Sequence, residues 1–275
     1  MRRYAEIRRE PLLAGRWRLM RLFILTDLEG VAGVSSFAQT RGNDEKLKEP
    51  GMRQLGREVN ACVEGIRAVY PDAEIDVWDG HGSGAIFKED IVGANYIPCT
   101  ERPYENMEGY AALLFVGQHA MAGTPFAPLC HTYSSLHIAY YRLNGLFVGE
   151  FGCRAFLAGL QGVPTVFIAG DDKAAHEAQV LIPEIETAVV KRGRGLEEAN
   201  SLSSAEACTS IRQGAERAVD RLGEIPPLGG IEAPFTLEIR YYNPIDAQRW
   251  DKPGVTIVDS YTVQISGDDL RAMPI

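Results

Sequence analysis

Short, continuous apolar runs alternate with helical patterns through residue 181 of this 275-residue chain. Four runs have the length and composition of buried strands, at 21–27, 74–80, 111–117 and 164–170. Three stretches between or after them are predicted to be helical, at 52–69, 152–160 and 172–181. Buried strands that alternate with helices predict an α/β fold, a layered α/β/α sheet domain.

The last third of the chain has a different pattern. Residues 203–222 are predicted to form a helix that begins with a capping box of Ser203 and Glu206. Residues 235–242 and 255–266 alternate apolar and polar side chains, as half-exposed antiparallel strands do. A hairpin with its turn at Asn144-Gly145 is also predicted. We therefore expect an α/β domain over 21–195 and a smaller α+β unit over 196–275, which can be intertwined with the first.

The first twenty residues are basic and differ from the rest. They carry six arginines and lack the apolar stretch of a secretory signal. We expect this extension, 1–20, either to be disordered or to result from a start assigned too early, with Met20 as the natural start.

Composition excludes several classes of protein. With 28 basic and 37 acidic residues the net charge is −9, which argues against nucleic acid as a partner. No apolar run approaches the ~18 residues of a membrane span. The five cysteines form no C-x-x-C pair, and this pattern favours reduced thiols in the cytoplasm.

Side chains that bind metals follow the predicted strands. Asp27 and Glu29 come directly after the first strand, His81 lies in a glycine-rich loop after the second, and His119 follows the third. Glu150 lies where the hairpin leads into a helix. Because α/β sheets carry their sites at the carboxyl ends of the strands, we expect these side chains to share one edge.

Several familiar catalytic motifs are absent from the sequence. The stretch HEAQV at 176–180 begins like a zinc-protease helix, but Val180 replaces its second histidine, so we expect His176 and Glu177 on a solvated helix face. No G-x-S-x-G elbow and no phosphate-binding loop occurs. The basic stretch KRGRG at 191–195 is interpreted as a surface turn.

Each candidate ligand taken alone has an ordinary explanation. An Asp-x-Glu after a strand is common, a histidine in a glycine loop is usually only a loop residue, and His131 could be a core or loop histidine. Three of the five histidines nevertheless fall on strand-end loops. Two histidines and three carboxylates supply enough nitrogen and oxygen ligands for two zinc-like ions that share a bridging carboxylate.

Six blocks of the sequence resemble those of the D-aminopeptidase family of bacterial zinc peptidases, also named dipeptide transport proteins. They are DLEGVAGV, DGHGSG, FVGQHAMAGTP, CHTYSS, VGEFGCRAFLAG and IAGDDKAAHEAQVLIP, in family order over residues 21 to 190. The resemblance implies a role for each candidate ligand: Asp27 would bridge two zinc ions, Glu29 and His119 would complete the ligands of one, and His81 and Glu150 those of the other.

The resemblance also implies that His131 is the catalytic residue. Whether its imidazole or a water on the metals attacks the substrate stays open. The implied activity is a zinc-dependent aminopeptidase that hydrolyses short peptides or amides with N-terminal D-amino acids, such as D-Ala, or Gly. The implied assembly is a homo-oligomer, a decamer, with active sites facing an internal channel.

Two other functions are compatible with the sequence. One is another two-metal hydrolase, such as an L-amino acid amidase or a phosphoesterase, although no Arg or Lys clamp adjoins the proposed ligands. The other, ranked last, is a non-enzymatic peptide-binding protein of an uptake system.

Overall fold

The computed structural model describes residues 20–41 and 45–275. The prediction for the basic extension therefore lies outside the described residues, apart from Met20. Within the two described ranges, no helix is both long and apolar enough to cross a lipid bilayer.

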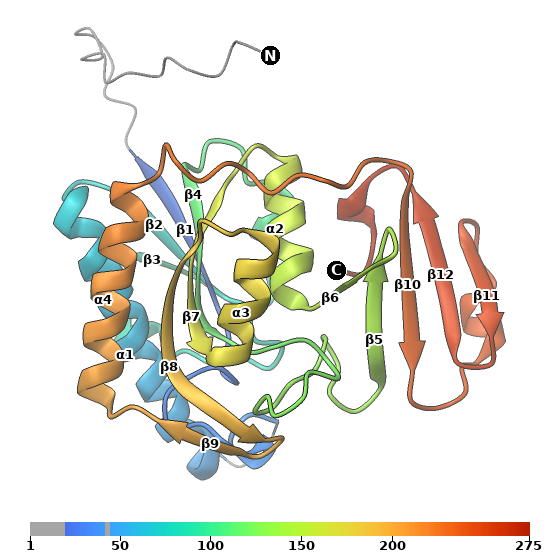
Figure 1. Cartoon of the computed structure of the whole chain (residues 1–275), viewed down its shortest axis with the longest axis horizontal. Coiled ribbons are helices and arrows are strands. Elements are labelled where there is room, and N and C mark those ends of the chain that lie inside the picture. Colours follow the sequence, from blue (N-terminus) through green and yellow to red (C-terminus); the bar gives the residue numbers. More distant parts are fainter. Residues whose placement is uncertain (1–19, 42–44) are drawn as a thin grey trace, which may run out of the picture.

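A seven-stranded sheet forms the centre of the molecule (Figure 1). Its order is β3 (Asn95–Ile97), β2 (Glu74–Asp79), β1 (Arg21–Thr26), β4 (Ala112–Gln118), β7 (Thr165–Asp171), β8 (Glu186–Gly195) and β9 (Glu198–Ser201). All neighbours pair in parallel except β8 and β9. The four strands predicted from apolar runs are β1, β2, β4 and β7, and β1 lies between β2 and β4.

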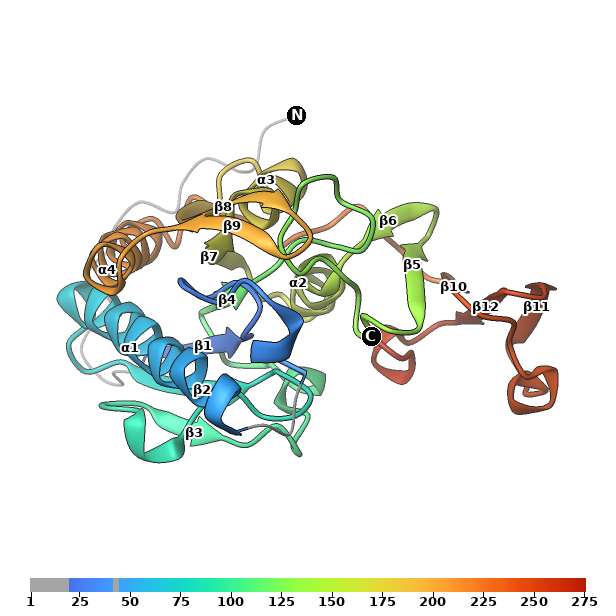
Figure 2. The same cartoon turned by 90° about the horizontal axis from the view of Figure 1, so that it is seen from below.

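Helices cover both faces of this sheet. The long helices α1 (Glu45–Val69) and α4 (Ser204–Asp220) pack together on one face, and α2 (Glu150–Leu160) and α3 (Asp172–Leu181) lie on the other (Figure 2). Phe23, Phe115 and Phe167 of the strands are fully buried beneath them. This confirms the predicted α/β/α layering. The helix predicted from residue 52 begins at Glu45 instead. Its first turns were missed because they are mostly polar and carry no apolar repeat.

A second, antiparallel sheet extends from the side of α2. Its order is β11 (Val255–Asp259), β12 (Thr262–Gly267), β10 (Phe235–Tyr241), β5 (Ile138–Leu143) and β6 (Leu146–Val148). The predicted hairpin turn is confirmed, since Asn144 and Gly145 both adopt positive φ between β5 and β6. In Figure 2 the sheet is a single layer that projects from the molecule.

The described chain also has short 3-10 helices, at Phe37–Gln39, Lys88–Asp90, Pro103–Glu105, Ala247–Trp250 and Leu270–Ala272. The predicted capping box of α4 is confirmed: the Ser203 hydroxyl accepts from the Glu206 amide, and the Glu206 carboxylate accepts from the Ser203 amide.

Candidate metal centre

The loops after β1 and β4 meet at the carboxyl edge of the central sheet. The Gly30 amide donates to the Gly117 carbonyl (2.7 Å), and the Asp27 amide donates to the Val116 carbonyl (3.0 Å). A Cβ at Gly30 would lie 2.1 Å from the Gln118 carbonyl oxygen, so any larger residue would push the two loops apart. Glycine is therefore required for Asp27 and the residue after Gln118, His119, to approach each other.

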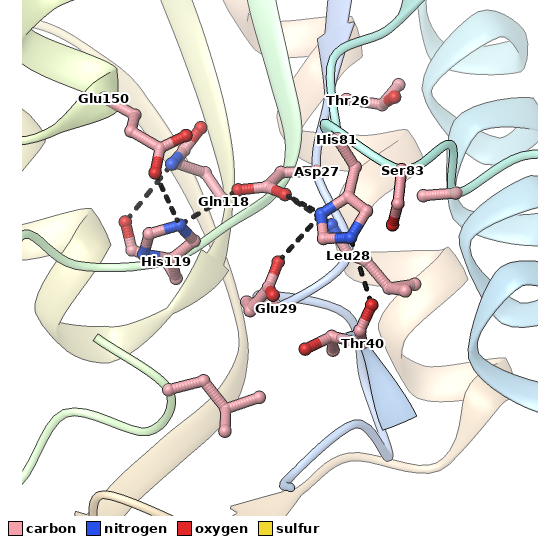
Figure 3. A network of polar contacts seen from close by, with 12 residues as sticks. Thr26, Asp27, Leu28, Glu29, Thr40, His81, Ser83, Gln118, His119 and Glu150 are labelled. Atoms are coloured by element: carbon pink, nitrogen blue, oxygen red, sulfur yellow. Dashed lines mark hydrogen bonds and ion pairs between the residues drawn. The ribbon is translucent and has the colours of Figure 1, made fainter. Parts of the chain in front are cut away.

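Asp27 lies at the centre of the cluster, between two histidines (Figure 3). Its Oδ1 is 3.1 Å from Nδ1 of His81, and its Oδ2 is 3.1 Å from Nε2 of His119. Glu29 Oε2 lies 3.2 Å from the same nitrogen of His81, and Glu150 Oε1 lies 3.4 Å from the same nitrogen of His119. The structure therefore brings together all five residues that the sequence put forward as ligands.

These contacts associate Glu29 with His81 and Glu150 with His119. The resemblance pairs the carboxylates with the other histidines. Glu29 could nevertheless share a metal ion with His119 as well, because ligand atoms of Asp27, Glu29 and His119 all lie within 4.8 Å of one another.

The second nitrogen of each histidine faces a backbone carbonyl. His81 Nε2 lies 3.2 Å from the Thr40 carbonyl oxygen, and His119 Nδ1 lies 2.9 Å from that of Ala120. A carbonyl can only accept, so these nitrogens carry the hydrogen. In the neutral rings, the nitrogens that face the carboxylates then hold lone pairs, the arrangement usual for histidines that bind metals.

Lone pairs facing carboxylates repel unless a cation or a proton lies between them. Three buried atoms of the cluster also lack a hydrogen-bond partner among the described residues: Asp27 Oδ2, Glu29 Oε2 and His119 Nε2. Buried polar atoms are normally satisfied, so three together at one point are unusual. The residues present therefore fit a bound metal cation.

Protonation of a histidine is the other way to relieve this repulsion. The directions of the pKa shifts show how the charges in the cluster act on one another. Burial alone would lower the pKa of His119, but the carboxylates of Asp27 and Glu150 outweigh it and raise that pKa well above its ordinary value. Burial would raise the pKa of Glu29, but His81 outweighs it and lowers that pKa. The cluster is thus a site of high negative charge that attracts any cation, proton or metal.

His131 lies beside the cluster rather than at its centre. Its ring stacks on that of His119 with centroids 4.0 Å apart, and its Nε2 is 3.5 Å from Glu150 Oε1. Its Nδ1 donates to the Leu129 carbonyl (2.9 Å). Burial, followed by the charge of His119, lowers the pKa of His131, which favours the neutral ring. His131, His119 and Glu150 also form a group that could hold a metal, so geometry alone does not separate His131 from the ligands.

Two other acids at the same edge of the sheet serve the backbone instead. Asp79 accepts hydrogen bonds from the amides of Ala85 and Ile86 and so closes the loop that carries His81. Asp171 accepts from the Lys173 and Ala174 amides and caps α3. Strand-end acids thus differ in role although their local sequences look alike.

The prediction of a surface turn at 191–195 is wrong. These residues belong to β8, and Lys191 is only 1% exposed. Its Nζ donates to the carbonyl oxygens of Glu29 and Val34, so it supports the ligand loop from behind. Burial lowers the pKa of Lys191 to about 8. The apolar residues directly before Lys191 indicated a strand, but the basic residues after them favoured the interpretation as a surface turn.

The prediction of a solvated face for α3 holds for His176, which is exposed, but is wrong for Glu177. The Glu177 carboxylate accepts from the Met121 amide (2.8 Å), two residues after His119. Burial raises the pKa of Glu177 to about 7. The side chain thus holds the loop that carries His119. The local sequence does not show this role, because Glu177 and Met121 are 56 residues apart in the chain.

Two neighbouring cavities are lined by residues of the cluster. A cavity of about 370 Å³ and one of about 270 Å³ share three lining side chains, Asp27, Tyr133 and Glu150. The smaller cavity adds Glu29, His81, His131 and Arg41, and the larger one adds Trp78, Tyr104, Arg102 and Arg154. A ligand bound at the cluster therefore has space beside it in both cavities.

Comparisons with known proteins identify the family to which the chain belongs. A family model described as D-aminopeptidase matches residues 20–274. A D-aminopeptidase of Bacillus subtilis (strain 168) is 29% identical over 263 residues, which cover 91% of this chain and 93% of the relative. The solved structure of the Zn-dependent D-aminopeptidase DppA from Bacillus subtilis, described as a self-compartmentalizing protease, superposes with a TM-score of 0.82 at 28% identity, covering 92% of this chain and 93% of that one.

Proposed function

Since the chain belongs to the D-aminopeptidase family and is a peptidase, we propose that it is a zinc-dependent aminopeptidase that releases N-terminal D-amino acids or glycine from short peptides. The observation that carries this proposal is the Asp27 carboxylate, which lies 3.1 Å from a nitrogen of each of two histidines and has one buried oxygen without a partner among the described residues. Such a carboxylate is suited to lie between two cations.

Five residues would hold zinc at this site: Asp27, Glu29, His81, His119 and Glu150. Imidazole nitrogen and carboxylate oxygen are ordinary zinc ligands, and each of the two histidines has its other nitrogen against a carbonyl. We propose two ions, because the two oxygens of Asp27 face different histidines. When bound, zinc would polarise the carbonyl of the scissile bond and lower the pKa of a nearby water.

His131 is the residue proposed to move the proton. Its Nδ1 is held by the Leu129 carbonyl, so Nε2 is the nitrogen free to take a proton. Burial lowers the pKa of His131 and so favours the neutral ring, the form that acts as a base. The same nitrogen can then return the proton to the amine that leaves.

Substrate chirality is the finest part of the proposal, and its test uses matched amides. With zinc bound, we expect kcat/KM for D-alanine amide to exceed that for L-alanine amide by roughly tenfold or more, because a misplaced side chain loses the geometry of attack. A chelator should abolish both activities, and added zinc should restore them. We also expect D-Ala-D-Ala and glycine-containing short peptides to be cleaved in preference to L-Ala-L-Ala. A clear preference for the L-amide would contradict the D-specific part of the proposal.

We also propose that the chain assembles into a homo-oligomer, a decamer. The five-stranded sheet projects as a single layer, and its strand β11 exposes two apolar side chains: Ile257 and Val258 are 42% and 51% exposed. Exposed apolar groups on one element are typical of interfaces. The related structure is described as self-compartmentalizing.

Light scattering of the purified protein should report a mass several times the 30.2 kDa of one chain. Replacing Ile257 and Val258 together by Asp should shift the protein towards smaller species. A fully active monomer in the unsubstituted protein would contradict the proposed assembly.

A further inference from the structure

Helix α3 carries a carboxylate that the proposed mechanism does not use. Glu177 reaches from α3 to the loop after β4, where its Oε2 accepts from the Met121 amide (2.8 Å). Its Oε1 is buried and has no hydrogen-bond partner among the described residues. This second oxygen lies beside Gly149, at the start of α2.

Glu177, Met121 and Gly149 meet so closely that no further side chain fits between them. A Cβ at Gly149 would lie 2.7 Å from Glu177 Oε1 and 2.7 Å from the Cβ of Met121. Against burial, which raises the pKa of Glu177, the amides of Met121 and Gly149 both act to lower it. Gly149 is the N-cap residue of α2 and has no side chain to cap the first amides of that helix. Because a negative charge is favourable at a helix N-terminus, Glu177 supplies from α3 the group that this N-cap lacks.

The two backbone segments that Glu177 joins carry two of the proposed zinc ligands. His119 precedes Met121 by two residues, and Glu150 directly follows Gly149. In the cluster, His119 Nε2 lies 3.4 Å from Glu150 Oε1, so these two side chains would share one ion. Their approach depends on how closely the two backbone segments are held together.

The other pair of proposed ligands, Glu29 and His81, is supported by different residues. Nζ of Lys191 donates to the Glu29 carbonyl oxygen, and Asp79 closes the loop that carries His81. The contacts of Glu177 described above lie on the opposite side of the cluster, with Met121 and Gly149. A change at Glu177 should therefore act on one ion and spare the other.

We infer that Glu177 is a positioning residue for one of the two zinc ions: it holds the segments of His119 and Glu150 at the separation that this ion requires, before the ion binds. The inference rests on the proposed two-zinc centre and adds the residue that sets the affinity of one half of it. Replacing a residue that orients metal ligands commonly lowers metal affinity by roughly tenfold to a hundredfold.

The test titrates the metal-free protein with zinc in a calorimeter and compares the parent with Glu177→Gln. The glutamine keeps one accepting oxygen, but its NH2 group would face either the Met121 amide or the start of α2, where a second donor is unfavourable. We expect two binding steps in the parent and, in the variant, one unchanged step and one weakened by roughly tenfold to a hundredfold. Glu184→Gln is the matched control, since Glu184 is exposed just after α3, and it should bind zinc like the parent.

Two further backgrounds identify the ion that is weakened. In His81→Ala the remaining ion would depend on His119 and Glu150, so adding Glu177→Gln should weaken that ion by the same factor. In His119→Ala the remaining ion would depend on Glu29 and His81, so Glu177→Gln should change its affinity by no more than about twofold. A merely structural role of Glu177 would instead lower the thermal stability of the metal-free protein and weaken both ions alike, which would overturn the inference.

Hydrogen exchange of the parent tests the inference without any substitution. The segments at Met121 and Gly149 should exchange slowly already in the metal-free protein, because the contacts of Glu177 do not need zinc. Fast exchange of these segments until zinc is added would overturn the inference, as would unchanged binding of both ions in Glu177→Gln, and either result would leave the proposed function standing. A parent protein that binds no zinc would overturn the proposed function together with the inference.

Discussion

Asp27→Asn is expected to empty the cluster of zinc and to lower kcat/KM by at least about a thousandfold, since metal polarisation of a carbonyl is worth several kcal/mol. The amide has the shape of the carboxylate but not its charge, and one of its two ends is a donor. The amide NH2 group would face the nitrogen of His81 or His119 that lies 3.1 Å from the carboxylate of Asp27. A cation could then no longer lie between the two side chains at that position. Elemental analysis of zinc per chain, alongside the rate, checks the result.

Asp171→Asn is the matched control for this experiment. Asp171 is also a buried acid at the end of a central strand, but its carboxylate caps α3. Asparagine caps helices about as well as aspartate does, so this variant should keep its zinc and most of its activity. Full zinc content and activity in Asp27→Asn would mean that the cluster is not the metal site.

His131→Ala is expected to keep its zinc and to lower kcat by roughly a hundredfold to ten-thousandfold, the usual contribution of a proton-transferring side chain. The proposed ligands remain in this variant, whereas the nitrogen that would take the proton is removed. Zinc content and kcat should therefore change independently, unlike in Asp27→Asn. A single measurement of activity could not separate the two roles.

His176→Ala controls for the loss of a histidine, because His176 is exposed on α3 and lies outside the cluster. It should match the parent in zinc content and rate. The informative contrary result is zinc loss in His131→Ala. The geometry allows that result, since His131 forms a group with His119 and Glu150, and it would make His131 a ligand.

Four strands of the central sheet and the helices beside them could be predicted because they depend on local patterns, whereas the order of the strands across the sheet was not predicted. Four apolar runs became β1, β2, β4 and β7 with ends displaced by a residue or so. The shared edge of candidate ligands also followed, since parallel strands end on the same side of a sheet. Strand β8 was missed although apolar residues precede Lys191, because Lys191 is charged and its burial depends on carbonyls of a loop far away in the chain.

The sequence alone determined which chemical groups arrive at the carboxyl edge: two carboxylates after β1, a histidine after β2 and another after β4. It did not distinguish Asp27 from Asp79 or Asp171, which follow the same kind of strand. Tertiary structure decided that Asp27 faces two histidines while the other two acids face backbone amides. It also joined β5 to β10, from distant parts of the chain, in one sheet. The physical reason is range: apolar periodicity and capping act over a few residues, whereas contacts between distant positions exist only once the whole core has packed.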